Sequence, residues 1–225
     1  MRAKSKLLAL ALTAALQPAL AGVVSLNFED INANVSPDGT GMVQLLDRYQ
    51  GLGVQFLGDA WGVTSLRCDG LSGFVPHDNG CAALQLAGDP RDNTVEAGKT
   101  FTLNFASGFV AGSSFFFSAL GGSNVSITLY DEVDGKGRSI PLGGLPTADC
   151  TIPGARFCVW NQLNFDFGGI ARSMVVTGND ETLMLDDIRL VQAASAPGNL
   201  PEPGSIALAV GALGALGWVR RRAAR

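Results

Sequence analysis

Apolar and polar residues alternate with a period of two along most of the chain between residues 22 and 192. This alternation is typical of β-strands that bury one face. Glycine, asparagine, aspartate or proline stands in nearly every gap, as expected for turns. About nine or ten strands in roughly 170 residues predict an all-β fold, a single antiparallel β-sandwich with a jelly-roll or Greek-key path. The alternating segments are residues 23–28, 53–58, 82–88, 99–107, 112–120, 124–132, 157–167, 171–178 and 181–191.

Helical patterns are confined to the two ends, apart from a short helix that the sequence allows near residues 43–49. Residues 1–21 combine a basic start (MRAKSK), an apolar run (LLALALTAAL) and an Ala-Leu-Ala site. These are the three parts of a secretory signal peptide, which predicts cleavage after Ala21 and export of the remainder. The alternative is a buried N-terminal helix.

The C-terminal end has the pattern of a short membrane-spanning helix. After a small and polar linker at 193–200, the 17 residues between Glu202 and Arg220 carry no charge. Because proline cannot continue a helix, Pro201 and Pro203 predict that the span covers about 204–219. The basic residues that follow match the cytoplasmic side of an inner membrane, and they are Arg220, Arg221, Arg222 and Arg225.

The order of these C-terminal elements resembles the PEP-CTERM sorting signal of Gram-negative bacteria. Pro201, Glu202 and Pro203 form the motif, and an uncharged helix and the arginine cluster follow it. Leu200 stands where many members have valine. The resemblance implies recognition by exosortase, a membrane protease-transpeptidase, transient anchoring in the inner membrane, and delivery to the cell surface or extracellular matrix. The alternative is a plain C-terminal anchor.

Removing both ends makes the remaining chain strongly acidic. Residues 22–200 contain 9 Lys and Arg against 19 Asp and Glu, so the formal charge is 9 − 19 = −10. A domain with this charge is repelled by nucleic acid, which excludes DNA or RNA as a partner.

The four cysteines all lie in the exported part, where an even number favours disulfides. No Cys-x-x-Cys motif occurs and the chain has one histidine, so a zinc site is not predicted. Three pairings are possible, and we favour the local ones, which close short turn-rich loops. These are Cys68 with Cys81 and Cys150 with Cys158.

The sequence does not predict an enzyme. His77 is the single histidine, no Gly-x-Ser-x-Gly motif accompanies it, and a turn-like stretch favours a solvated loop residue. A glycosidase needs two carboxylates across a sugar bond, and no pair stands out.

The exported domain shows a second resemblance. The strings LNFEDI (26–31), YQGLGVQF (49–56) and SMVVTGNDETLMLDDIRL (173–190) are similar to galactose-binding-like β-sandwiches of carbohydrate-binding modules. The resemblance implies a non-catalytic protein that binds carbohydrate, such as an exopolysaccharide. A structural matrix component without a small ligand, and a secreted hydrolase, are the alternatives.

Two acidic pairs predict a structural calcium ion. Glu29-Asp30 follows the first strand and Asp186-Asp187 lies in the last, and such strands can run side by side in a sandwich. Neighbouring carboxylates need a cation or hydrogen-bond donors, and Ca²⁺ prefers oxygen ligands; the resembled family often has such a site. Strand alternation puts one member of each pair on a given face, and we predict Glu29 and Asp187 as ligands. The alternative is that these acids accept backbone hydrogen bonds.

Sugar rings stack on exposed aromatic side chains, so we also predict Trp61 and Tyr49 as ligand contacts, whereas Trp160 is expected in the core. The strand at 112–120 carries Phe115, Phe116 and Phe117 in succession, so at least one of these rings must face outward.

Overall fold

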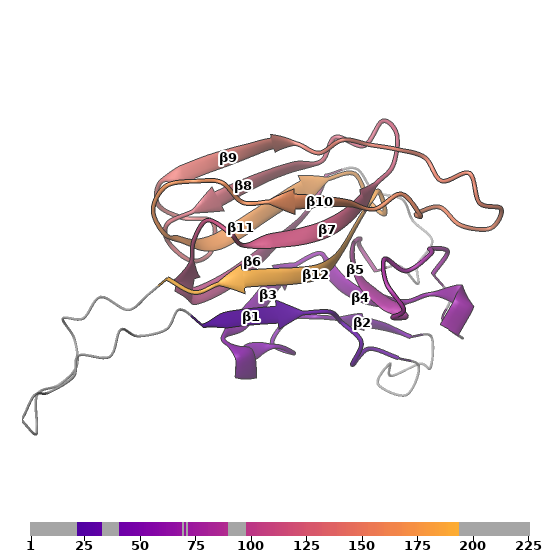
Figure 1. Ribbon diagram of the computed structural model, residues 1–225, viewed down its shortest axis with the longest axis horizontal. Helices are drawn as coiled ribbons and strands as arrows, with labels where there is room; N and C mark the ends of the chain where they lie inside the picture. Colours follow the sequence, from indigo (N-terminus) through magenta and orange to yellow (C-terminus); the bar gives the residue numbers. More distant parts are fainter. Residues whose placement is uncertain (1–21, 33–40, 69, 71, 90–97, 194–225) are drawn as a thin grey trace, which may run out of the picture. The chain divides into compact units, whose positions relative to one another are not determined.

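The computed structural model describes residues 22–32, 41–68, 70, 72–89 and 98–193. These residues form twelve β-strands and two 3-10 helices, and no α-helix lies among them (Figure 1). The strands are β1 (Val23–Leu26), β2 (Met42–Gln44), β3 (Val54–Gly58), β4 (Ala60–Thr64), β5 (Ala82–Leu86), β6 (Lys99–Phe109), β7 (Ser114–Ala119), β8 (Ser126–Tyr130), β9 (Ser139–Gly144), β10 (Asn161–Asn164), β11 (Ala171–Gly178) and β12 (Leu183–Val191), and the helices are η1 (Gln50–Leu52) and η2 (Leu66–Cys68).

The strands pair into two antiparallel sheets, which confirms the predicted sandwich. One sheet has the order β10-β7-β12-β5-β4-β2, with β1 also paired to β12, and the other has the order β3-β6-β11-β8-β9. The first and last strands therefore lie side by side, as expected (Figure 1). Strand β12 is nine residues long, so β5 pairs with its start and β1 with its end along one edge.

The main core lies between the two sheets and is built from the inward side chains that the alternation predicts. It is rich in phenylalanine: Phe56, Phe101 and Phe105 come from the five-stranded sheet, and Phe115 and Phe117 from β7 of the other. Phe116 projects from the opposite face of β7 and is half-buried there. One ring of the three therefore faces away from the main core, as predicted.

A second, smaller core covers the outer face of the seven-stranded sheet. Trp61 of β4 and Met184 of β12 pack there against Phe74 and Phe157, which belong to two long connections and form a parallel bridge. Strands β4 and β5 are consequently buried on both faces. Each connection is closed by a local disulfide, so the favoured pairings, Cys68–Cys81 and Cys150–Cys158, are the ones present. Two disulfides are consistent with an exported protein.

The prediction of a short helix near residues 43–49 is wrong. Residues 42–44 form β2, which pairs with β4, and the helical turn η1 begins later, at Gln50. Gly62 of β4 lies opposite Val43, and its missing side chain makes room for Ile31 and Leu45. Tertiary packing against this glycine favours an extended chain over a local helix.

Within the described ranges, no helix has the length and hydropathy needed to cross a membrane. The predicted signal peptide at 1–21 and the sorting signal at 201–225, with its span at about 204–219, lie outside the described residues.

Candidate functional site

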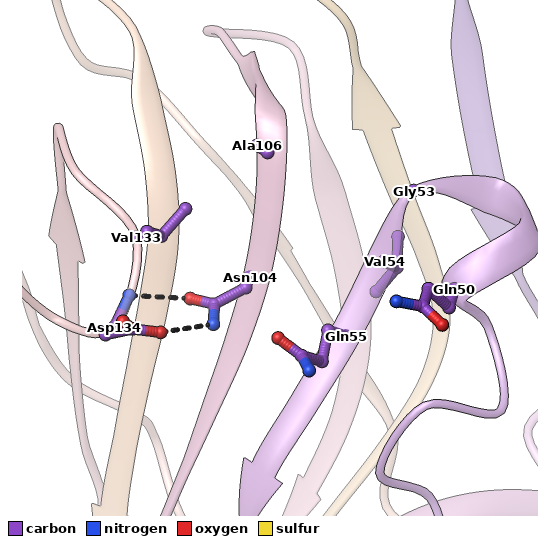
Figure 2. A pocket seen from close by; sticks show the side chains of 8 residues that line it. All are labelled: Gln50, Gly53, Val54, Gln55, Asn104, Ala106, Val133 and Asp134. Atoms are coloured by element: carbon purple, nitrogen blue, oxygen red, sulfur yellow. Dashed lines mark hydrogen bonds between the residues drawn. The ribbon is translucent and has the colours of Figure 1, made fainter.

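The outer face of the five-stranded sheet contains a pocket with polar walls, which we call the sheet pocket (Figure 2). Its cavity is about 430 Å³. Gln55 of β3, Asn104 of β6 and Ser173 of β11 are partners across the sheet, so their side chains leave the same outer face. The lining residues are Gln50, Gly53, Val54, Gln55, Asn104, Ala106, Val133 and Asp134.

One wall of the sheet pocket is the connection between β8 and β9, which is tied down onto the sheet. Asn104 Nδ2 donates to Asp134 Oδ1 and Asp134 N–H donates to Asn104 Oδ1, both at 2.8 Å (Figure 2). The Gly135 N–H donates to Ser173 Oγ at 3.0 Å, and that hydroxyl donates to the Glu132 carbonyl at 2.6 Å. The loop is therefore fixed in place by four hydrogen bonds before any ligand enters.

The opposite wall offers polar groups that are free to bind. Gln55 Nε2 donates to Asp47 Oδ1 at 2.8 Å, and no described residue bonds to its Oε1. The carboxamide of Gln50 likewise has no hydrogen-bond partner in the described ranges. With Val133 and Ala106 as the apolar part of the lining, these groups suit a ligand that combines hydroxyl groups with C–H faces.

Sequence reasoning missed these pocket residues and predicted two aromatic contacts instead. The structure buries both: Tyr49 is 8% exposed and Trp61 is 6% exposed. The Tyr49 hydroxyl donates to Asp30 Oδ1 at 2.6 Å. Burial is the main cause that raises the pKa of the phenol well above its ordinary value, and the hydrogen bond with Asp30 is the second. Trp61 belongs to the second core. Neither ring has an open face on which a sugar could stack, so this part of the prediction is corrected.

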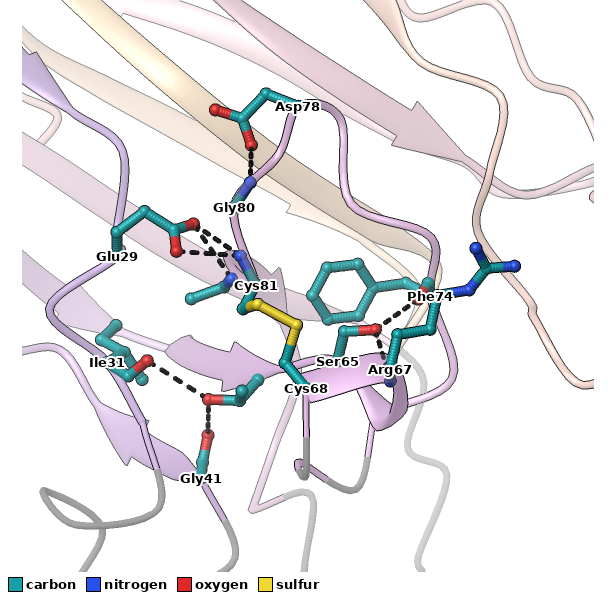
Figure 3. Close-up of a disulfide and its surroundings, with 12 residues drawn as sticks. Glu29, Ile31, Gly41, Ser65, Arg67, Cys68, Phe74, Asp78, Gly80 and Cys81 are labelled. Carbon is teal, nitrogen blue, oxygen red and sulfur yellow. Dashed lines mark hydrogen bonds between the residues drawn. A yellow bond between two sulfur atoms is a disulfide. The ribbon is translucent and has the colours of Figure 1, made fainter.

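The two predicted calcium ligands have other partners. The Glu29 carboxylate accepts hydrogen bonds from the Cys81 N–H at 2.8 and 3.0 Å and from the Ala82 N–H at 3.1 Å (Figure 3). Asp187 Oδ2 lies 3.1 Å from His77 Nδ1. In the part of the chain that the structure describes, no group of three or more His, Cys, Asp or Glu side chains is arranged to hold a metal ion. Glu29 therefore has the role that we gave as the alternative, an acceptor for backbone donors.

Asp186 does not point away from Asp187, contrary to the expected alternation. The pairing of β12 with β7 shifts between Asp186 and Arg189, and Asp187 has a positive φ of 47°. This bulge places both carboxylates on the outer side of the sheet. Asp186 is 1% exposed, and burial, with smaller contributions from the carboxylates of Asp187, Asp78 and Glu29, raises its pKa to about 8.

His77 is packed rather than solvated, which corrects the expectation for this loop. Its ring stacks on Phe116 with a centroid separation of 3.6 Å, and the Trp160 ring lies edge-on at 5.9 Å. Trp160 is half-buried against the second core, and its Nε1 donates to the Val75 carbonyl. Asp187 is the hydrogen-bond partner of His77, and no serine hydroxyl bonds to it within the described residues.

No protein-family model matches the chain, and no curated protein matches it significantly. Several solved structures are distantly similar. A family 61 carbohydrate-binding module in complex with β-1,4-galactotriose is 14% identical, with 74% of this chain and 94% of that chain covered and a TM-score of 0.37. A family 29 module is 12% identical, with coverages of 68% and 90% and a TM-score of 0.35. The enzymatically active domain of bacteriophage CBA120 tailspike protein 4 is 14% identical, with coverages of 72% and 22% and a TM-score of 0.37.

Proposed function

We propose that this chain is an exported surface or matrix protein that binds carbohydrate in the sheet pocket without catalysis. The observation that carries the proposal is a fixed polar wall, Asn104 with Asp134, facing the Gln50 carboxamide and the Gln55 Oε1, neither of which has a hydrogen-bond partner among the described residues. Planar amides and carboxylates are well suited to the adjacent hydroxyl groups of a sugar ring, because an amide donates and accepts in one plane and a carboxylate accepts with two oxygens in one plane.

The charge of the domain favours a neutral or cationic glycan over an acidic one. Residues 22–200 carry a formal charge of −10, and Asp134 is itself a lining residue. A uronic-acid polymer would be repelled over a distance comparable with the Debye length. An exopolysaccharide of neutral or amine-bearing sugars is the ligand class that this surface admits.

Export and sorting form the second part of the proposal. Two disulfides support an oxidising location, and the sequence at both ends supports secretion followed by PEP-CTERM processing by exosortase. Intact-mass spectrometry of the protein recovered from the producing cell tests this part. We expect a mature chain that begins at Gly22 and ends close to Pro201, whereas recovery of both intact termini would contradict it.

A glycan array tests the binding part. The purified full chain is compared with Gln55→Ala and with the control Gln44→Ala, which removes an exposed glutamine from the other sheet. We expect binding to a small set of neutral glycans that is lost at least tenfold in Gln55→Ala and retained in Gln44→Ala. An array without any bound glycan would favour the alternative, a structural component without a small ligand. Equal binding by both variants would show that the ligand binds outside the sheet pocket.

A further inference from the structure

The floor of the sheet pocket continues beyond the cavity along strand β6. Alternate residues of a strand share a face, so Ala106, Asn104 and Thr102 follow one another on the outer side of β6. The first two line the cavity together with Gly53 and Gln55 at the edge strand (Figure 2). From Ala106 to Thr102 the strand rises about 13 Å, which is longer than one sugar ring. The floor therefore extends past the part of a ligand that the cavity encloses.

Thr102 supplies a hydroxyl group in the row beyond the cavity. The residue is half-buried, and its hydroxyl has no hydrogen-bond partner among the described residues. Its partners across the sheet are Leu57 of β3 and Val175 of β11, both half-buried on the same outer face. A hydroxyl between two apolar side chains repeats the mixed lining of the cavity, and it suits a second sugar of the same chain.

Two walls determine the direction of a ligand that is longer than the cavity. On one side the β8–β9 loop lies directly on β11, because a Cβ atom at Gly135 would lie 2.8 Å from Val175 Cγ2. On the other side the turn before β3 borders the edge of the sheet. There Gln50 lines the cavity, and Asp47 accepts the hydrogen bond from Gln55 Nε2. These walls close a path across the strands, so a long ligand must run along β6.

We propose that the sheet pocket binds an internal segment of a linear glycan, which runs along β6 and places its next sugar over Thr102. The proposal rests on the proposed function for its ligand, a neutral glycan, and adds the class and the direction of that ligand. A floor with walls at both sides suits the middle of an unbranched chain, since a branch would meet the loop or the turn.

A series of chain lengths tests the class of ligand. Unbranched oligomers of one to six sugars are titrated into the full chain by calorimetry, in three series: β-1,4-linked glucose, β-1,3-linked glucose and β-1,4-linked N-acetylglucosamine. We expect the affinity in at least one series to rise at least tenfold from the dimer to the tetramer and to change little beyond it. Affinity that does not rise in any of the three series would overturn the proposal.

Blocking the chain ends tests whether the bound segment is internal. The hexamer of the series that binds is reduced at one end and methylated on the terminal sugar at the other end. We expect the blocked hexamer to bind with the affinity of the unmodified one, because the sugars between the two ends are unchanged. A loss of affinity of tenfold or more would show that the pocket recognises a chain end, and it would overturn the proposal.

Thr102→Val locates the additional contact, and Thr128→Val is its matched control. Both threonines are half-buried partners of Val175 on the outer face, but Thr128 of β8 lies beyond the loop that packs on Val175. Each substitution replaces a hydroxyl with a methyl group and keeps a β-branched side chain. Thr102→Val should weaken binding of the tetramer at least threefold and leave the dimer unchanged, whereas Thr128→Val should change neither. Equal effects of the two variants would overturn the proposal.

Gln55→Ala separates this proposal from the proposed function, because it removes a group of the cavity itself. We expect it to weaken binding of every chain length. If only the internal segment is wrong, Gln55→Ala still weakens binding, whereas chain length and Thr102→Val have no effect. If the proposed function is wrong, no oligomer binds, or Gln55→Ala leaves the affinity of every chain length unchanged.

Discussion

Asn104 and Asp134 exchange two hydrogen bonds of 2.8 Å between β6 and the loop after β8, 30 residues apart in sequence. Asn104 is 5% exposed, so the pair joins a nearly buried side chain to an exposed loop. Asp134 also has a positive φ of 61°, a conformation that aspartate and asparagine tolerate better than most residues. This one pair of residues therefore supplies two of the four hydrogen bonds that hold the wall of the sheet pocket.

Replacing Asn104 by alanine should destabilise the domain and weaken glycan binding together. The change leaves the Asp134 N–H and carboxylate without their partners, which costs about 1–3 kcal/mol. Asp134→Asn is the matched control, because its side-chain oxygen still accepts from Asn104 and its backbone N–H still donates. Urea unfolding measures the stability of the two variants, and the glycan array measures their binding. Equal stability of Asn104→Ala and the wild type would show that the loop is held by other contacts.

Glu29→Ala should destabilise the domain whether or not calcium is present. The substitution removes the acceptor for the N–H groups of Cys81 and Ala82, and loss of charge-assisted bonds of this kind costs about 2–3 kcal/mol. Unfolding is measured with EDTA and with added CaCl₂. A destabilisation that is present only with CaCl₂ would instead support the prediction from the sequence that Glu29 and Asp187 bind a calcium ion.

The stability of the domain should fall as pH rises from about 4 to about 8 through Asp186. Burial raises its pKa from 3.8 to about 8, so the folded protein keeps a proton that the unfolded chain has already lost in this range. Protonated Asp186 makes its full contribution to the unfolding free energy below the pKa that Asp186 has in the unfolded chain. This contribution is lost as the pH rises to the pKa of the folded protein, at a rate on the order of 1 kcal/mol per pH unit.

Asp186→Asn tests this dependence, since an amide does not titrate. Urea midpoints at pH 4.5, 6 and 7.5 should decline less steeply for the variant than for the wild type, and the variant should be the more stable of the two at pH 7.5. Parallel curves would show that Asp186 is ionised in the folded protein, with its charge compensated.

Long alternating strands were predictable from the sequence nearly to the residue. The segments 99–107 and 171–178 correspond to β6 and β11, because each strand turns an apolar face to the main core and carries mostly polar residues on the other. Strand β4 was missed, since burial on both faces removes the alternation. Strand β9 was also missed, because it is an edge strand with Pro141 and two glycines and carries little apolar signal.

The sites were less predictable because they depend on pairing between distant segments. Alternation alone puts Gln55 and Asn104 on outer faces, but nothing local shows that they are neighbours or that Asp134 reaches Asn104. At Asp186 and Asp187, the bulge overrides the alternation on which the prediction relied. The prediction that Trp61 contacts a ligand failed for a related reason. Phe74 and Phe157, which lie in distant connections, cover the Trp61 ring.

Both disulfides should stabilise the cover over the second core. Cys68–Cys81 and Cys150–Cys158 join residues 13 and 8 apart, and closing loops of this size contributes about 2–3 kcal/mol each. The double variant Cys68→Ala/Cys81→Ala should lower the unfolding free energy by that amount and increase acrylamide quenching of Trp61 fluorescence in a Trp160→Phe/Trp218→Phe background. Unchanged quenching would show that the loop packs without its covalent link.

The most direct test of the account is amide hydrogen exchange with and without a glycan identified on the array. Binding in the sheet pocket predicts slower exchange in residues 50–55 and 131–136, with little change in the Cys150–Cys158 connection. Slower exchange confined to other parts of the domain, with these two segments unchanged, would contradict the claim that the five-stranded sheet holds the ligand.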